Sequence, residues 1–380
     1  MNKKISLKIA VVVVLIFAGL FAGISESQAN VAEATVIFLL IAPGARAGGM
    51  GEAFVAITDD ATATWWNPAG LAFLKNREFT FMHVKWLPGF RLEGLYYDFV
   101  SYINNVEDWG TFGMNVIFLN LGETEGRNEL NQFTGMFRTF ETAISGSYGA
   151  TVTDNLAIGL NTKFIYSHLS DRGAGQEQGT GTSSNFALDL GILYKTRVPF
   201  AGTRVNFGIP FTSARINFGM PIFGNRINFG ANLANLGPKM AYIDAAQADP
   251  IPTNLKFGLA LHMVDMPDNR LTFVFEMNKL LVRKDLDDGV TDPFYIALVT
   301  AWTDEPVFTD MIYNMGFEYW YSDLVALRTG YYHDEMGDVK PFTYGASFKV
   351  SSYRFDFSYV AAGKGHPLTD TMRLSLTVDF

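Results

Sequence analysis

The last ten residues of the chain, TMRLSLTVDF at positions 371–380, alternate without exception between polar and apolar side chains. The even positions hold Met372, Leu374, Leu376, Val378 and Phe380, and every odd position is polar. Successive side chains of an extended strand point to opposite faces, so a period of two separates the two kinds. The segment therefore predicts a β-strand with one apolar and one polar face.

The same alternation recurs upstream, for example over residues 353–359, 271–277 and 255–261. Fourteen such segments are predicted as strands, at about 77–86, 92–104, 109–119, 138–150, 154–168, 183–197, 226–236, 253–264, 270–280, 311–321, 324–333, 342–350, 353–361 and 371–380. Their connections alternate between short turns and long polar or glycine-rich links, as in transmembrane barrels with short periplasmic turns and long external loops. With both termini in the periplasm, every long link is extracellular.

A soluble β-sandwich would alternate in the same way, so composition has to separate the two. Hydrophobic residues make up 48% of the chain and aromatic residues 14%, with 33 phenylalanines. The single buried face of a soluble sandwich does not usually need so much phenylalanine, whereas an outer face in lipid is rich in it. The sequence therefore predicts an all-β fold, a transmembrane antiparallel β-barrel of about fourteen strands. Phe380 resembles the terminal aromatic assembly signal of outer-membrane barrels.

Charged residues fall on the polar face of the predicted strands. They are Lys163, Asp189, Lys256, Glu276, Glu318, Arg328, Arg354, Asp356, Arg373 and Asp379. On the lipid face each cationic one would cost about 2–4 kcal/mol at mid-membrane, so their position supports a barrel with a polar interior. They either line a path through the lumen or pair with one another and with a plug, and pairing is the favoured interpretation.

Residues 45–74, ARAGGMGEAFVAITDDATATWWNPAGLAFL, are rich in small residues and poor material for a strand. Asp59 and Asp60, followed by threonines, can cap a short helix. Asn67 precedes a proline and is therefore extended or in a turn. Such a segment folds back into the barrel as a hatch of short helices, or forms a soluble cap. In the hatch interpretation residues 30–76 form an N-terminal plug and residues 77–380 form the barrel.

This stretch resembles the opening motif of the PorV/PorQ family of outer-membrane barrels, and its NPA tripeptide is similar to that of the larger FadL fatty-acid-transporter superfamily. Further matches are LANLGPKM (233–240), PTNLKFGLAL (252–261), FEYWYSDLVALRTGYY (317–332) and FDFSYVAAGKGHPLTDTMRLSLTVDF (355–380). The hatch motif that the resemblance marks comprises Arg46, Gly48, Gly51, Asp60, Asn67, Pro68, Ala69 and Gly70.

The resemblance implies the outer membrane of a Gram-negative-type bacterium and a docking or shuttle role in protein secretion or surface attachment by the type IX system. A FadL-like channel for hydrophobic small molecules is the alternative, and a purely structural surface protein is a third. The partners would be outer-membrane lipid, secretion or surface-attachment proteins, or a hydrophobic ligand. On two long links, an apolar ligand pocket or a protein-docking surface could be formed by Phe133, Met136, Phe137, Met240 and Tyr242.

Residues 1–29 are typical of a secretory signal, because three lysines precede the apolar run 9–21 and small residues occupy the end of the segment. A retained membrane anchor is the alternative. Removal of this segment changes the formal charge from −9 to −11, since three lysines and Glu26 leave with it. An acidic chain argues against nucleic-acid binding.

The chain repeats itself before the seventh predicted strand, with RVNFG from residue 204, RINFG from 215 and RINFG from 226. The first two copies lie in an insertion at about 199–225. Pro210 and Pro221 interrupt it and disfavour a central place in a sheet. The insertion is predicted as a periplasmic hairpin, and the alternative is two more barrel strands, sixteen in all.

No pattern of catalytic, cofactor-binding or metal-ligating residues stands out, so we expect neither an enzyme nor a cofactor. The chain has no cysteine, and the five histidines His83, His168, His262, His333 and His366 show no paired ligand spacing. Residues 285–289 begin like a calcium loop, but Ile296 stands where the closing glutamate should be.

Overall fold

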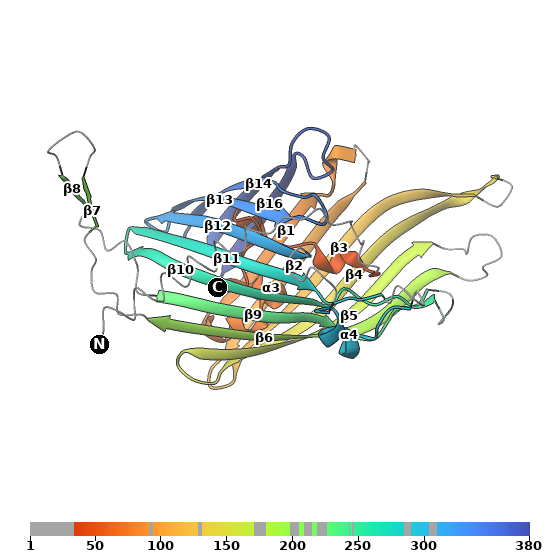
Figure 1. The fold of residues 1–380 in the computed structure, drawn as a ribbon, viewed down its shortest axis with the longest axis horizontal. Helices are drawn as coiled ribbons and strands as arrows, with labels where there is room; N and C mark the ends of the chain where they lie inside the picture. The colour runs from red at the N-terminus through yellow and green to blue at the C-terminus, as the bar shows by residue number, and fades with distance from the viewer. Residues whose placement is uncertain are drawn as a thin grey trace.

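A computed structural model describes residues 34–90, 94–127, 131–170, 180–197, 205–208, 215–218, 226–242, 244, 247–284, 290–303 and 310–380. Fourteen strands close into one barrel, and neighbouring strands along the chain pair antiparallel (Figure 1). The barrel strands are β1 (Arg77–Lys85), β2 (Tyr96–Val106), β3 (Gly110–Arg127), β4 (Phe133–Thr151), β5 (Leu156–Ser170), β6 (Gly181–Arg197), β9 (Arg226–Leu236), β10 (Asn254–Met266), β11 (Asn269–Leu280), β12 (Met311–Tyr321), β13 (Val325–Asp334), β14 (Phe342–Val350), β15 (Tyr353–Ala361) and β16 (Thr371–Asp379). The predicted fold class and strand number are confirmed.

The hairpin of β3 and β4 is longer than the sequence predicted. Residues 122–137 read as a polar, glycine-rich link, yet the ladder continues through Glu123↔Arg138 up to Arg127↔Phe133. The pairing crosses an irregularity between Asn120 and Gly122. A bulge lets an antiparallel ladder continue past a break in the alternation. The hairpin therefore stands beyond the neighbouring strands (Figure 1).

The alternating side chains point the opposite way from those of a soluble sandwich. On β16, Arg373 is 3% exposed, whereas Met372 and Leu374 on the other face are 51% and 59% exposed. On β6 the exposed face likewise carries Phe186 and Leu188, while Asp189 is fully buried. An apolar outer face and a polar interior are the features of a barrel in lipid. The transmembrane interpretation of the pattern is confirmed.

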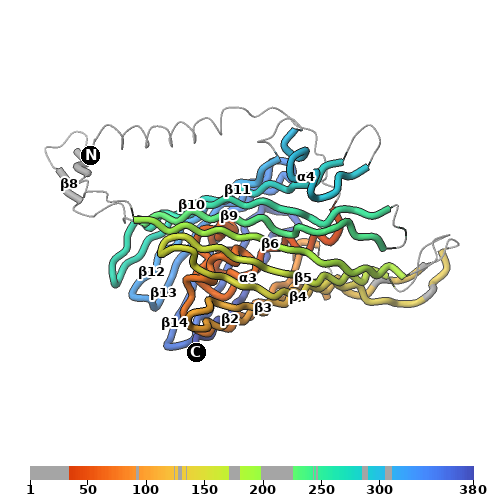
Figure 2. The backbone as a smooth tube through the Cα atoms, turned by 90° about the horizontal axis from the view of Figure 1, so that it is seen from below, coloured from red at the N-terminus to blue at the C-terminus, as the bar shows by residue number. Residues whose placement is uncertain are grey.

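The barrel lumen is filled by the hatch, defined here as residues 34–76. It contains η1 (Ile37–Leu40), α2 (Ala45–Gly48), α3 (Ala63–Trp66) and η2 (Pro68–Phe73). Its residues hydrogen-bond or ion-pair with eleven of the barrel strands, β1 to β4, β6, β9, β11, β12 and β14 to β16. A segment that touches strands around the whole ring lies inside it, as the red and orange trace in Figure 2 shows.

The two ends of the described chain lie at opposite ends of the barrel. Thr35 N donates to Pro250 O, in the long connection between β9 and β10, at 3.0 Å. Phe380 N donates to Arg77 O, at the start of β1, at 2.9 Å. The hatch therefore runs through the lumen from the long-link end to the short-turn end. That both termini are periplasmic stays a prediction, because the N-terminus itself is not among the described residues. The predicted signal, and a mature terminus at Asn30, lie outside the described residues.

The inserted repeats form a separate two-stranded sheet. β7 (Val205–Gly208) pairs antiparallel with β8 (Arg215–Phe218), and this pair is not part of the closed barrel. The barrel therefore has fourteen strands, as the hairpin interpretation predicted, and the alternative of sixteen strands is excluded. Two short helices, η3 (Pro88–Phe90) and α4 (Phe294–Thr300), lie in connections of the barrel. Among the described residues, no helix is both long and apolar enough to span a membrane.

Candidate functional site: the hatch and its anchors

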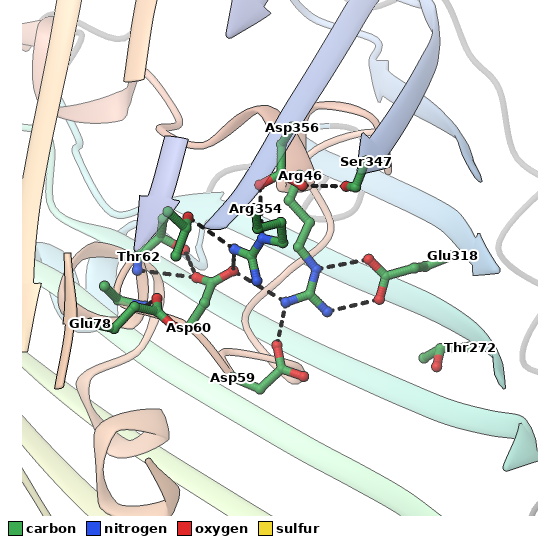
Figure 3. A network of polar contacts seen from close by, with 12 residues as sticks. Arg46, Asp59, Asp60, Thr62, Glu78, Thr272, Glu318, Ser347, Arg354 and Asp356 are labelled. Carbon is green, nitrogen blue, oxygen red and sulfur yellow. Dashed lines mark hydrogen bonds and ion pairs between the residues drawn. The ribbon is translucent and has the colours of Figure 1, made fainter. Parts of the chain in front are cut away.

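Arg46 of α2 is the centre of a buried ionic network that joins the hatch to the barrel wall (Figure 3). Its Nε and Nη2 donate to the two carboxylate oxygens of Glu318 on β12, each at 2.7 Å. On its other side, Nη1 donates to Asp59 Oδ1 at 2.6 Å and to Asp60 Oδ2 at 3.1 Å. A two-pronged arginine–carboxylate pair fixes orientation as well as charge. Arg46 therefore fastens the hatch to one wall strand.

Two wall arginines complete the network. Arg354 of β15 donates to Asp60 Oδ2 and to Asp356 Oδ2, both at 2.9 Å. Arg328 of β13 donates from Nε to Glu318 Oε2 at 2.7 Å. Three arginines thus alternate with the carboxylates of Asp59, Asp60, Glu318 and Asp356. Buried charges are tolerated when each has such partners.

A second anchor binds the middle of the hatch to β10 and β11. Glu276 Oε2 accepts hydrogen bonds from the backbone N–H groups of Phe54 and Val55, both at 2.8 Å. Lys256 Nζ lies 4.0 Å from Glu276 Oε1 and 4.1 Å from the centre of the Trp65 ring. A cation over an aromatic face is attracted by the ring quadrupole. The inward charges therefore pair with one another and with the plug, the favoured interpretation of the sequence.

The remaining inward charges follow the same rule. Lys163 Nζ lies 2.9 Å from Asp189 Oδ2, and Arg373 Nη2 donates to Glu52 of the hatch at 2.5 Å. At the short-turn end, Lys349 Nζ lies 3.3 Å from Asp379 Oδ2. None of the ten inward charges predicted from the sequence lies without a partner in the part of the chain that the structure describes.

Asn67 is a third anchor, and it is fully buried. It is extended, with φ −166° and ψ 104°, as expected for a residue before proline. Its Nδ2 donates to Val55 O in the hatch and to Ile192 O on β6, both at 3.0 Å, and its Oδ1 accepts from Ala69 N at 3.1 Å. Pro68 occupies the first turn of η2, where a missing N–H costs nothing. The predicted extended peptide and its polar anchoring are present.

Glycines let the hatch backbone pass close to the wall. A Cβ on Gly191 of β6 would collide with Asn67 Oδ1, and one on Gly159 of β5 would collide with the Pro68 backbone. Within the hatch, Gly51 has φ +66°, and a Cβ there would lie 2.6 Å from Tyr331 O. The other two glycines of the predicted motif are also enclosed: a Cβ on Gly48 would meet Arg373, and one on Gly70 would meet Thr58.

Around the anchors the lumen holds an apolar cluster of hatch and wall residues. Phe38 and Leu39 of η1 are completely or almost completely buried, and they share the cluster with Trp66. Met240 is 2% exposed and belongs to it. Tyr242 packs against it, and its hydroxyl donates to Ser167 Oγ at 2.9 Å. Burial raises the pKa of the Tyr242 phenol above its ordinary value, so the hydroxyl keeps its proton.

The five residues predicted as one ligand or partner surface are therefore not brought together. Phe133 and Met136 are 61% and 52% exposed on the extended β3–β4 hairpin, and Phe137 is partly buried there. Met240 cannot contribute to an exposed surface because it lies inside the lumen. Spacing along the sequence could not show which of the two links is exposed and which is buried, since both links are long and polar. Phe380 is 75% exposed at the other end of the barrel.

Sequence reasoning missed two parts of the site. Glu78 of β1 is 4% exposed, and it accepts a hydrogen bond from Ala61 N at 2.5 Å. The wall glycines were not singled out either. A signal for both was available, because Glu78, Gly159 and Gly191 stand at inward positions of their strands. A glycine inside a strand often marks a close approach of another backbone.

The described residues contain no group of three or more histidine, aspartate or glutamate side chains placed to hold a metal ion. His83, His262 and His333 lie in different strands. His168 stacks on Phe140 at 5.3 Å, and His366 Nδ1 accepts from Leu368 N. The partial calcium motif at residues 285–289 lies outside the described residues. What the arrangement can do is hold a plug in a closed position.

Solved structures with a similar fold include two toluene transporters. TbuX from Ralstonia pickettii is 13% identical, with 90% of this chain and 100% of that chain covered and a TM-score of 0.49. TodX from Pseudomonas putida is 13% identical, with coverage of 93% and 99% and a TM-score of 0.49. A FadL homologue from Pseudomonas aeruginosa is 11% identical, with coverage of 89% and 98% and a TM-score of 0.43.

A search of curated proteins found no match. The family model described as type IX secretion system protein PorV matches residues 24–287, which is more than half of the chain. The matched region includes the whole hatch, with the Arg46 and Asn67 anchors, and the wall strands from β1 to β11. The chain therefore belongs to the family of the type IX secretion system protein PorV.

Proposed function

We propose that the protein is a closed docking scaffold of the outer membrane, which holds secreted or surface-attached proteins during type IX secretion and has no enzymatic activity of its own. The observation that carries the proposal is the plugged lumen. Arg46 ties the hatch to Glu318 by two hydrogen bonds of 2.7 Å, and Asn67 ties it to β6. A barrel closed in this way offers its surface to partners, not its interior.

The long-link end offers the surface for such partners. The β3–β4 hairpin extends beyond the barrel and exposes Phe133 and Met136. Exposed apolar side chains on a projecting element are typical of protein-interaction sites. The family assignment supports a partner among the proteins of the secretion system.

A channel for hydrophobic small molecules is the second candidate, because the lumen holds an apolar cluster. That cluster is occupied by the chain itself, since Phe38 is 0% and Leu39 is 1% exposed. A ligand would have to displace η1 before it could bind. This requirement separates the two candidates in an experiment.

The proposal is tested by capture from detergent-solubilised outer membranes of the native organism. A double variant with Phe133→Ser and Met136→Ser is expected to recover less of the secretion or attachment proteins than the wild type. Val152→Ser is the control, because Val152 is 56% exposed but lies in a turn at the other end of the barrel. Equal capture by both variants would count against the docking role.

The channel candidate has its own readout. Wild-type protein that carries a stoichiometric hydrophobic compound through purification, and loses it when Leu39→Trp fills the cluster, would favour the channel. No bound compound, together with loss of partner capture in the hairpin variant, would favour the scaffold.

A further inference from the structure

The lipid-facing surface carries a trough that crosses four neighbouring strands, β14, β15, β16 and β1. One wall follows the cross-strand register Ala346↔Phe357, Phe357↔Leu374 and Leu374↔His83. The other wall is the parallel register of Phe348, Phe355, Leu376 and Phe81. Both rows point outward, as their alternation with the buried inward residues shows.

The trough is a real hollow with a volume of about 570 Å³. Its floor is the backbone of the intervening row, Ser347, Asp356 and Ser375, whose side chains face the lumen. Ala346 makes it possible, because it is the one small side chain among the eight wall residues. The hollow has the width of the gap between two side-chain rows on one face, which are two residues apart along a strand, or roughly 7 Å.

One end of the trough is polar although it lies on the lipid-facing surface. His83 Nδ1 lies 2.6 Å from Asp98 Oδ1 on β2, and both side chains point outward. Lys85, two residues further along the same face of β1, is exposed. Cationic and acidic side chains on a barrel exterior are tolerated near the interface but not at mid-membrane. These three residues therefore mark the edge of the apolar belt at the long-link end.

The other end of the trough lies deeper in the belt. His83 is two residues from the end of β1, whereas Ala346 is the middle residue of the nine-residue strand β14. Barrel strands are tilted by about 35–45°, so a row perpendicular to them also crosses the membrane obliquely. The trough thus leads from a polar interface into the apolar belt. An amphiphile with one chain and one charged head has this shape.

We propose that the trough binds one acyl chain of a phosphate-bearing membrane lipid, with the phosphate of its head held by His83 and Lys85. Hydrophobic burial cannot select this lipid, because the tails of all lipids are as apolar as the trough. Selection comes from the head, where a phosphate oxygen can accept hydrogen bonds from the Lys85 ammonium and the His83 ring. This site is independent of the docking function proposed above, since its four strands do not include β3 or β4.

The test uses four proteins in nanodiscs that contain equal amounts of phosphatidylglycerol and a digalactosyl diacylglycerol, which has no phosphate. They are the wild type, Ala346→Phe, the double variant His83→Gln with Lys85→Gln, and Ala231→Phe. Ala231 also faces outward, on β9, and pairs with Phe257, so its variant is the matched control. Native mass spectrometry counts the lipids retained, and heat-modifiable migration verifies that each barrel is folded.

The wild type and Ala231→Phe are expected to retain one phosphatidylglycerol, and Ala346→Phe is expected to lose it because the new ring fills the trough. The double variant should lose its preference for phosphatidylglycerol over the glycolipid by roughly tenfold, the effect of losing a hydrogen bond to a charged group. Equal retention by the two alanine-to-phenylalanine variants would overturn the proposal. A wild type that shows no preference for the phosphate-bearing lipid would also overturn it. The same holds if the wild type, but not Ala346→Phe, captures a protein in place of the lipid.

Discussion

Replacing Arg46 by alanine is expected to release the hatch while the barrel stays assembled. The change removes the two bonds to Glu318 and the bond to Asp60, all between buried groups. Removing one partner of a buried ion pair costs about 3–5 kcal/mol, because the other charge stays buried. Asp59 adds at most about 1 kcal/mol, since its side chain is 48% exposed and water screens it.

The size of the effect follows from these costs. Arg328 still faces Glu318 and Arg354 still faces Asp60, so the lower figure of about 3 kcal/mol is the better expectation. A loss of that size raises the population of the released hatch by roughly a hundredfold. The barrel is not affected to the same degree, because its backbone hydrogen bonds form a closed ladder.

Single-channel conductance in planar bilayers measures the release. An empty barrel of fourteen strands lies between packed eight-stranded barrels and open porins, so an unplugged lumen should pass ions. Arg46→Ala should therefore show frequent openings against a nearly silent wild type. The matched control is Arg138→Ala, because Arg138 is 78% exposed and its 3.3 Å pair with Glu123 lies outside the lumen. That control should behave like the wild type.

Two outcomes would refute the reasoning. A folded Arg46→Ala barrel that is as silent as the wild type would show that the ionic network does not hold the hatch. A wild type that already conducts like a porin would show that the hatch does not close the lumen. Heat-modifiable migration of every variant is needed to separate release of the hatch from failure to assemble.

Four further outcomes are expected. Asn67→Leu should assemble but open more often than the wild type in bilayers, because the buried carbonyl groups of Val55 and Ile192 lose their hydrogen-bond donor, at a cost of about 1–3 kcal/mol each. An unchanged conductance would show that Asn67 does not hold the hatch. Gly191→Ala should push the hatch from β6 and raise conductance, whereas Gly146→Ala should not, because a Cβ on Gly146 would lie 3.7 Å from Thr162 Oγ1, an ordinary contact distance. Deleting Phe380 should lower the yield of heat-modifiable barrel more than deleting an exposed loop residue does, and equal yields would discard the assembly signal. The intact mass of the membrane form should correspond to a chain that starts at Asn30, and a mass that includes residues 1–29 would show a retained anchor.

Alternation along the chain determined the barrel without any tertiary information. A strand with Met372 and Leu374 on one face and Arg373 on the other is stable either in a soluble sandwich or in a membrane barrel. The high phenylalanine content favoured the barrel, in which the apolar face meets lipid. The number of strands followed from the same pattern, because every wall strand must repeat it. The extended Asn67 followed from the chemistry of the next residue, a proline.

Only the tertiary structure decided which charges meet. Glu318 and Arg46 are separated by 272 positions, and the period of two gives their faces but not their partners. It also decided that Met240 lies inside the lumen while Met136 lies outside, since both belong to long links with similar composition. The path of the hatch through the lumen could not be predicted from the sequence either, because it depends on contacts between distant segments. Local pattern fixes which side of a strand faces the lumen, whereas contacts between distant segments depend on how the closed barrel and its plug pack against each other.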